Sequence, residues 1–337
     1  MTEGPLALGA RLAEAAGLPP ALSAEPLPGG RNNRVFRLAL ADERSAALKI
    51  YFRHPDDRRD RLGAEWEFLE HARRLAAGFT PKALARDAEA GAALYGFVEG
   101  RRLPPELVDA SAVETAAEFI RKVASPGAAK HLRVASEACF SISEHVAAVD
   151  RRVRRLETID AQAPGTRDAA HFVTETVRPA WERVRDGIWK ACRALGLDPE
   201  RRIGDADIIA SPSDFGFHNA LRTPQGLVFL DFEYAGRDDP AKLVCDFFCQ
   251  PELPVALAHH ELFLAQALDK LDLAHHRARV SVLLDGYRIK WIAIILNDFL
   301  AVGGERRDFA KLEDQEQRRL RQLALARRRL DALALNT

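Results

Sequence analysis

The chain has 337 residues, and its 49 Lys and Arg residues balance 49 Asp and Glu residues, so the formal net charge at pH 7 is +0. This balance excludes the strongly basic character of a typical nucleic-acid-binding protein, and a hydrophobic fraction of 47% is ordinary for a globular protein of about two domains. No apolar run of about 18 residues is present, and the N-terminal segment lacks the pattern of a signal peptide. We therefore expect a cytoplasmic protein without nucleic-acid or membrane partners.

The first hundred residues predict a small unit of mixed helices and strands. Apolar residues alternate in its strand-like runs and recur at helical spacing in its helix-like runs. A polar, glycine-rich turn at 29–33 separates the first helix from a predicted hairpin. The expected elements are a helix over 5–17, room for a short strand before the glycines, strands over 35–40 and 46–51, a helix over 62–77 and a strand over 92–98.

Most of the remaining chain is predicted to be helical. Residues 105–196 are rich in Ala, Leu, Glu and Arg, and helical patterns resume at Ala241. Between them, 208–231 predicts loops and a short hairpin whose clear strand is 227–230. The last helix, over 318–335, carries leucines and arginines; we favour a terminal helix packed through its leucines over a membrane-surface or partner helix.

The cysteines give no sign of a metal site. Cys245 and Cys249 are four residues apart in a predicted helix and share a face, but no further ligand lies near them in sequence. We expect these two, together with Cys139 and Cys192, to be buried as small apolar side chains.

The strongest chemical pattern joins two neighbouring segments. Asp214 is followed five residues later by Asn219, and the apolar run 227–230 then leads directly into Asp231 and Glu233. The end of a strand presents carboxylates rigidly, and Mg²⁺ prefers carboxylate and amide oxygens together with nucleotide phosphates. Asn219 and Asp231 supply such a pair of ligands, which leaves Asp214 to orient and deprotonate an attacking hydroxyl.

These residues resemble the aminoglycoside phosphotransferase and choline kinase group of the protein-kinase-like superfamily. Asp214 and Asn219 match the Asp and Asn of the group's H-x-D-x-x-x-x-N pattern, and Asp231 and Glu233 match its D-x-[DE] pattern. The stretch 234–241 is similar to the group's E-Y-A-G-x-x-D-P-A stretch, and Asp246 to a later Asp at slightly longer spacing.

The resemblance implies an α+β, bilobal protein-kinase-like fold. A small β-rich, nucleotide-binding N-lobe is expected at 1–100, and a larger, mainly helical C-lobe with the catalytic loop, metal site and substrate-binding helices at 101–337. It further implies ATP and Mg²⁺ as cofactors. The expected reaction moves the γ-phosphate to a hydroxyl of a small molecule, such as a sugar, an amino alcohol or an aminoglycoside-like compound.

The N-terminal half supplies the other parts that such a kinase needs. Gly29, Gly30 and Asn33 lie in the glycine-rich turn, which resembles the group's G-G-x-x-N-x-x-[YF] loop over the phosphates. Lys49 lies mid-strand among apolar neighbours, which is unusual unless its side chain points into a polar cleft. Glu65 in the following helix is its expected partner, and helical spacing leaves Glu70 as an alternative. Lying in the strand that resembles the adenine-binding hinge, Phe97 and Val98 complete the predicted nucleotide contacts.

Two features of the catalytic segment bear on this interpretation. The group's loop His, regarded as structural, is Pro212 here, which keeps a catalytically impaired pseudokinase or scaffold as the alternative. The letters Asp-Phe-Gly at 214–216 imitate the metal-binding motif of protein kinases. We assign the metal to Asp231 instead, because no Asn lies between Asp205 and Asp214 and no clear strand is predicted to lead into Asp214.

Overall fold

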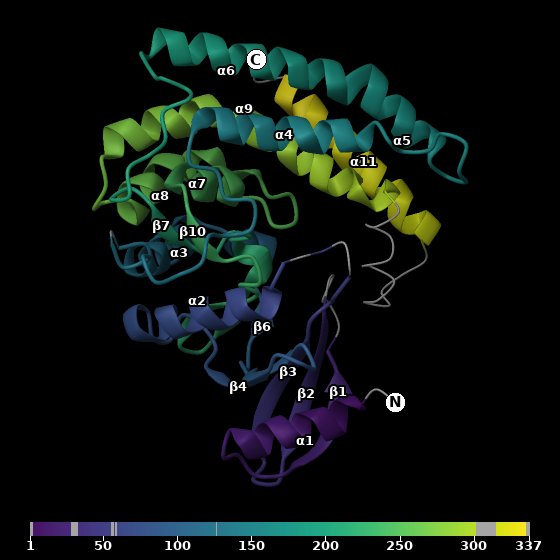
Figure 1. Cartoon of the computed structure of the whole chain (residues 1–337), viewed down its shortest axis with the longest axis vertical. Coiled ribbons are helices and arrows are strands. Elements are labelled where there is room, and N and C mark those ends of the chain that lie inside the picture. The colour runs from purple at the N-terminus through teal and green to yellow at the C-terminus, as the bar shows by residue number, and fades with distance from the viewer. Residues whose placement is uncertain are drawn as a thin grey trace. The chain divides into compact units, whose positions relative to one another are not determined.

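The computed structural model describes residues 3–27, 33–54, 57, 59–125, 127–300 and 315–334. The chain divides into two compact units (Figure 1). The first contains Met1–Pro104 and Phe217–Ala235, and the second contains Pro105–Gly216 and most of the chain from Gly236 onward. Residues 217–235 thus group with the N-terminal strands, whereas the sequence-based division placed them in 101–337; the functions assigned to the two lobes stay predictions.

A five-stranded antiparallel sheet forms the body of the first unit. Its strand order is β1-β2-β3-β5-β4. Leu38, Leu48 and Leu94 lie in its core together with Leu8 and Leu12 of the first helix, because alternate residues of each strand share one face. The elements are α1 (Pro5–Ala15), β1 (Ala21–Pro26), β2 (Arg34–Leu40), β3 (Ser45–Ile50), α2 (Arg61–Leu75), β4 (Ala83–Asp87) and β5 (Ala92–Gly96).

The expected helices and strands of this unit are confirmed, including the short strand before the glycines. Two details differ. The strand expected over 92–98 ends at Gly96, whose N–H bonds to the Lys82 carbonyl at 2.8 Å. Strand β4 was not predicted, because its five residues are too few to show a period and its pairing with β5 is a long-range contact.

A smaller three-stranded sheet completes the first unit. It joins β6 (Arg101–Arg102) to the hairpin of β8 (Ala220–Thr223) and β9 (Gly226–Phe229), in the order β6-β8-β9. The Phe229 N–H donates to the Phe79 carbonyl at 2.8 Å, which ties the hairpin to the residues after α2. The predicted strand at 227–230 is confirmed as β9, and it brings Asp231 to the N-terminal unit.

The second unit is mainly helical. Its longest helix, α9, is buried on most sides and packs against α4, α6, α7 and α11 (Figure 1). The helices are α3 (Ala110–Val123), α4 (Ile142–Leu156), α5 (Arg167–Phe172), α6 (Arg178–Ala194), α7 (Pro240–Cys249), α8 (His260–Ala267), α9 (Leu273–Leu296) and α11 (Gln315–Ala334). Shorter elements are the strands β7 (Ile209–Ser211) and β10 (Gly236–Asp238), the π-helical turn Val173–Val177, and the 3₁₀ turns Pro105–Leu107, Leu257–His259 and Asn297–Phe299; a further 3₁₀ turn, Phe217–Asn219, belongs to the first unit.

The C-terminal helix packs as expected. Leu323, Leu330 and Leu333 are buried, and α11 contacts α9. Arg318 forms a buried ion pair with Asp298 at 3.0 Å. Across the residues that the structure describes, no helix is long and apolar enough to cross a membrane. All four cysteines are buried and none is in a disulfide, which confirms that they are buried as predicted.

Candidate functional site

Lys49 lies at the centre of a buried ion cluster in the first unit. Its Nζ atom is 2.6 Å from the Glu65 carboxylate on α2 and 2.6 Å from Oδ1 of Asp231, just after β9. Burial alone would lower the pKa of Lys49, but Asp231 and Glu65 raise it well above its ordinary value. The ammonium therefore stays charged in a place where an unpaired charge is costly.

The position of Glu65 follows from the start of α2. Asp60 caps this helix by accepting the Gly63 N–H at 2.9 Å, which fixes where the helix begins. Glu65 also accepts the Tyr51 hydroxyl at 2.8 Å. Glu70, the alternative partner, instead pairs with Arg73 at 3.2 Å on the exposed face. The structure therefore pairs Lys49 with Glu65.

Tyr51 is a site residue that sequence reasoning missed. It lies two residues after Lys49, and its hydroxyl oxygen is hydrogen-bonded to the hydroxyl oxygen of Tyr95 on β5 at 2.5 Å. Residues i and i+2 of a strand share a face, so the side chain that follows a functional Lys by two positions was identifiable from spacing alone. Burial raises the pKa of Tyr51, which keeps the hydroxyl protonated as a donor to Glu65.

Asn219 and Asp231 lie at the open end of the β8–β9 hairpin, Asn219 just before β8 and Asp231 two residues after β9. Ala220 pairs with Phe229 in register, and the Leu230 N–H donates to the Asn219 carbonyl at 2.8 Å. Asp231 has a φ of +65°, a left-handed conformation that is uncommon outside glycine and concentrates at functional sites. The hairpin thus brings the two predicted metal ligands to one end of one small sheet.

Asp231 is the most solvent-exposed of the three charged side chains in the ion cluster of Lys49. Its side chain is 40% exposed, whereas those of Lys49 and Glu65 are 9% and 4% exposed. Partial burial raises the pKa of Asp231; Lys49 opposes this rise, and Glu233 and Glu65 add to it. A carboxylate surrounded by other carboxylates gains from an additional cation.

The two residues after Asp231 fix its place. The Phe232 ring stacks on Phe68 of α2, with centroids 4.7 Å apart. Glu233 accepts the Asn33 side-chain N–H at 2.6 Å, and Arg61 approaches it at 3.5 Å. Each of the three positions from 231 to 233 therefore has contacts of its own within the first unit.

Asn33 was predicted to contact the nucleotide, and the structure shows what its side chain does here. Its amide donates to Glu233, 200 residues away in the chain, while its Oδ1 accepts the Phe52 N–H at 3.1 Å. These bonds hold the end of the glycine-rich turn. Gly29 and Gly30 lie outside the described residues, and their predicted role stays a prediction.

Phe97 and Val98 follow β5 directly, as a hinge segment would. Both are half-buried, and the Phe97 ring lies 4.7 Å from the Arg37 guanidinium. Their predicted contact with adenine stays a prediction.

The donor set in the first unit fits Mg²⁺. Asn219 and Asp231 offer hard oxygens, and Lys49 contacts Asp231 through one carboxylate oxygen. Within the described ranges no three His, Cys, Asp or Glu residues are grouped to hold a metal. Mg²⁺ commonly takes only one or two protein ligands and completes its shell with water and phosphate oxygens, so this small donor set suits it.

Asp214 belongs to the second unit, where it is half-buried after β7. A short strand, Ile209–Ser211, does precede it, which corrects the expectation that no strand leads toward Asp214. The strand became visible only through its pairing with β10. It ends three residues before Asp214, whereas Asp231 lies two residues after β9.

Solved structures with the same fold match nearly the whole chain. A choline kinase from Streptococcus pneumoniae superposes with a TM-score of 0.59 at 19% identity, over 96% of this chain and 98% of that one. Spectinomycin phosphotransferase, solved with ADP and spectinomycin, gives 0.60 at 12% identity, over 95% and 96%. A choline/ethanolamine kinase family protein from Mesorhizobium loti gives 0.54 at 20% identity, over 93% of each chain.

The expected α+β protein-kinase-like fold is confirmed by these neighbours, and so is the structural resemblance to choline kinases and aminoglycoside phosphotransferases. No protein-family model and no curated protein matches the chain by sequence. Because one fold supports many activities, function has to be argued from the side chains of the site.

Proposed function

We propose that the chain is an ATP- and Mg²⁺-dependent phosphotransferase that moves the γ-phosphate of ATP to a hydroxyl of a small molecule. The observation that carries this proposal is Lys49 held between Glu65 and Asp231, each at 2.6 Å. A buried lysine fixed by a helix glutamate, beside a carboxylate that follows a strand, is the arrangement that kinases use to hold triphosphate. The fold neighbours, described as choline kinases and a spectinomycin phosphotransferase, support the same reaction class.

Each residue has a distinct part in the proposed reaction. Lys49 neutralises phosphate oxygens while Glu65 keeps its ammonium in place. Asn219 and Asp231 would hold Mg²⁺, which when bound neutralises charge on the transferred phosphoryl group. Gly29 and Gly30 lie outside the described residues, and their part in the proposal, which is to let backbone N–H groups approach the phosphates, comes from the sequence alone.

Asp214 acts on the acceptor. Its carboxylate orients the hydroxyl and accepts the hydroxyl proton as the oxygen bonds to the γ-phosphorus. The bond from that phosphorus to the bridging oxygen breaks, and ADP leaves with the electron pair. Most of the acceleration comes from positioning and from fixed charges, since little covalent chemistry is required of the protein.

The experiment is a screen for ADP release across sugars, amino alcohols and aminoglycosides, with ATP and Mg²⁺ present. Asp214→Asn is expected to abolish acceptor-dependent release while leaving the fold intact. Asp186→Asn, which alters an exposed aspartate on α6, is the matched control and is expected to behave as wild type.

Pro212 favours the alternative function, a nucleotide-binding pseudokinase or scaffold. That function predicts that ATP raises the melting temperature while no acceptor yields phosphorylated product. A wild-type protein that shows this behaviour across the full acceptor screen contradicts the phosphotransferase proposal.

A further inference from the structure

Ser213, the residue before Asp214, is held by a buried lysine. Nζ of Lys242, on α7, donates to Ser213 Oγ at 3.0 Å and to Asp238 Oδ2 at 2.7 Å. Lys242 is 3% exposed and Asp238 is fully buried. A buried ammonium needs every partner that it has, so these two bonds constrain both ends of the contact.

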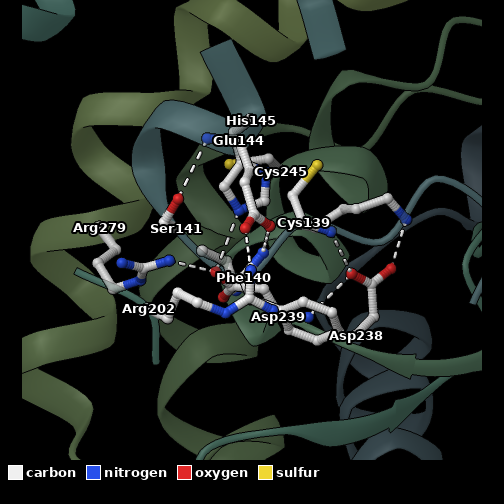
Figure 2. A network of polar contacts seen from close by, with 12 residues as sticks. Cys139, Phe140, Ser141, Glu144, His145, Arg202, Asp238, Asp239, Cys245 and Arg279 are labelled. Atoms are coloured by element: carbon white, nitrogen blue, oxygen red, sulfur yellow. Dashed lines mark hydrogen bonds and ion pairs between the residues drawn. The ribbon is translucent and has the colours of Figure 1, made fainter. Parts of the chain in front are cut away.

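Asp238 is itself held firmly in place, so it is a fixed anchor for this lysine. Its Oδ1 accepts the backbone N–H groups of Asp239 at 2.9 Å and Cys139 at 3.3 Å, as Figure 2 shows. Asp238 also pairs with Ile209 in the two-stranded sheet of β10 and β7, the strand that leads to the loop. The lysine therefore connects the loop to a part of the fold that cannot shift without losing several bonds.

The loop needs such an anchor because its backbone is strained. Ser213 has a φ of +69°, in the left-handed region that serine rarely adopts. The preceding Pro212 has no backbone N–H to donate. The Ser213 N–H donates to Ser211 Oγ at 3.1 Å, so Ser213 is held both through its backbone and through its hydroxyl.

The residue on the other side of Asp214 is fixed by packing. Phe215 is 2% exposed, and its ring lies 5.3 Å from that of Phe247 and 5.7 Å from that of Phe119. Asp214 thus lies between a hydrogen-bonded neighbour and an aromatic neighbour. The backbone of Asp214 is therefore held on both sides.

We infer that Lys242 is a positioning residue, which through Ser213 holds the Asp214 carboxylate where it accepts the proton of the acceptor hydroxyl. It does so in a loop where this chain has Pro212 in place of a histidine. The inference rests on the proposed phosphotransfer, and the lysine itself touches neither nucleotide nor acceptor in this role.

Ser213→Ala tests the contact while the ion pair of Lys242 and Asp238 stays intact. We expect kcat for ADP release to fall by about tenfold to a hundredfold, since small displacements of a catalytic group cost rates of that order, and KM for ATP to stay unchanged. Amide hydrogen exchange in the segment 211–216 is expected to become faster. Ser141→Ala, which removes the N-cap of α4 without touching the loop, is the matched control and should change neither kcat nor exchange in this segment.

Ser213→Gly separates the hydroxyl from the backbone strain. Glycine adopts a positive φ without strain. If strain limits the loop, this variant would gain activity; if the loop depends on the Ser213 hydroxyl, kcat falls as much as in the alanine variant. A charge-balanced pair, Lys242→Met with Asp238→Asn, should lower kcat to a similar extent, and adding Ser213→Ala to it should lower kcat no further.

Unchanged exchange in Ser213→Ala overturns the anchoring role. Faster exchange with an unchanged kcat overturns the catalytic role of the anchor. A wild-type protein without ADP release to any acceptor refutes the proposed function and the catalytic role together, and exchange then still decides whether Lys242 holds the loop.

Discussion

His145 and Asp239 form a hydrogen-bonded ion pair that is fully buried in the second unit. Nε2 of His145 lies 3.1 Å from Oδ2 of Asp239, and its Nδ1 lies 2.6 Å from the Tyr287 hydroxyl. Arg279 contacts the same Asp239 oxygen, as Figure 2 shows. The pair joins α4 to the N-terminus of α7, where Asp239 also caps the helix through the Ala241 N–H.

This pair predicts a loss of stability at alkaline pH. Burial alone would lower the pKa of His145, but Asp239, assisted by Cys139, raises it to about 9. A folded pKa above the unfolded value of 6.5 means that the stabilisation is complete below about pH 6.5 and is lost as pH rises through about 9. The other charged groups that face the pair are Asp238 and Arg279.

The measurement is the free energy of unfolding in urea between pH 6.5 and 9.5. We expect a decrease on the order of 3 kcal/mol, since one pKa unit corresponds to about 1.4 kcal/mol. His145→Gln should remove this slope while lowering stability at pH 6.5. A wild-type curve that is flat over this window contradicts the assignment.

Two of the glutamates of α2, Glu65 and Glu70, predict opposite outcomes. Glu65→Gln removes the charge that holds Lys49 and is expected to lower kcat by about a hundredfold, as the loss of one electrostatic group in a catalytic site commonly does. Glu70→Gln alters only a surface pair with Arg73 and should keep activity and stability within about 0.5 kcal/mol of wild type. Initial rates of ADP release for the two variants, side by side, check this; equal rates contradict the pairing as a catalytic feature.

Lys49→Met is expected to remove nucleotide binding and to destabilise the nucleotide-free protein. Glu65, 3% exposed, would lose its cation, and breaking a buried pair costs about 3 kcal/mol or more. The check is the melting temperature with and without ATP and Mg²⁺. Lys82→Met, at an exposed position, is the control and should show the wild-type shift with nucleotide. A full nucleotide shift in Lys49→Met would show that the lysine does not contact phosphate.

Asp231→Asn is expected to raise the Mg²⁺ concentration needed for half-maximal activity by at least about tenfold, because a neutral amide replaces the charged ligand. Titration of ADP release with MgCl₂ measures this value, and chelation by EDTA should abolish the nucleotide-dependent rise in melting temperature of wild type. Asp42→Asn, which alters a surface pair with Arg44, serves as control. An unchanged Mg²⁺ dependence in Asp231→Asn argues against metal ligation by this residue.

Local patterns in the sequence already determined much of this protein. Alternation and helical spacing identified the strand with Lys49, the helix with Glu65 and the strand before Asp231, because these periods depend only on which face each residue shows to the core. Polar residues at fixed offsets then indicated Asp214, Asn219 and Asp231 as candidates. The fold that the family resemblance of these residues implied is the one observed.

Tertiary structure decided what depends on pairs of distant residues. The choice of Glu65 over Glu70 required the rotation of α2 against β3, which packing sets and helical spacing does not. Asn33 meets Glu233 across 200 residues, and Lys242 meets Ser213 across 29. The identity of one side chain does not reveal a partner that far along the chain, since such contacts arise only when separate elements pack together. The sequence therefore indicated most residues of the candidate site, though not Tyr51, and the folded chain decided which of them hold one another in place.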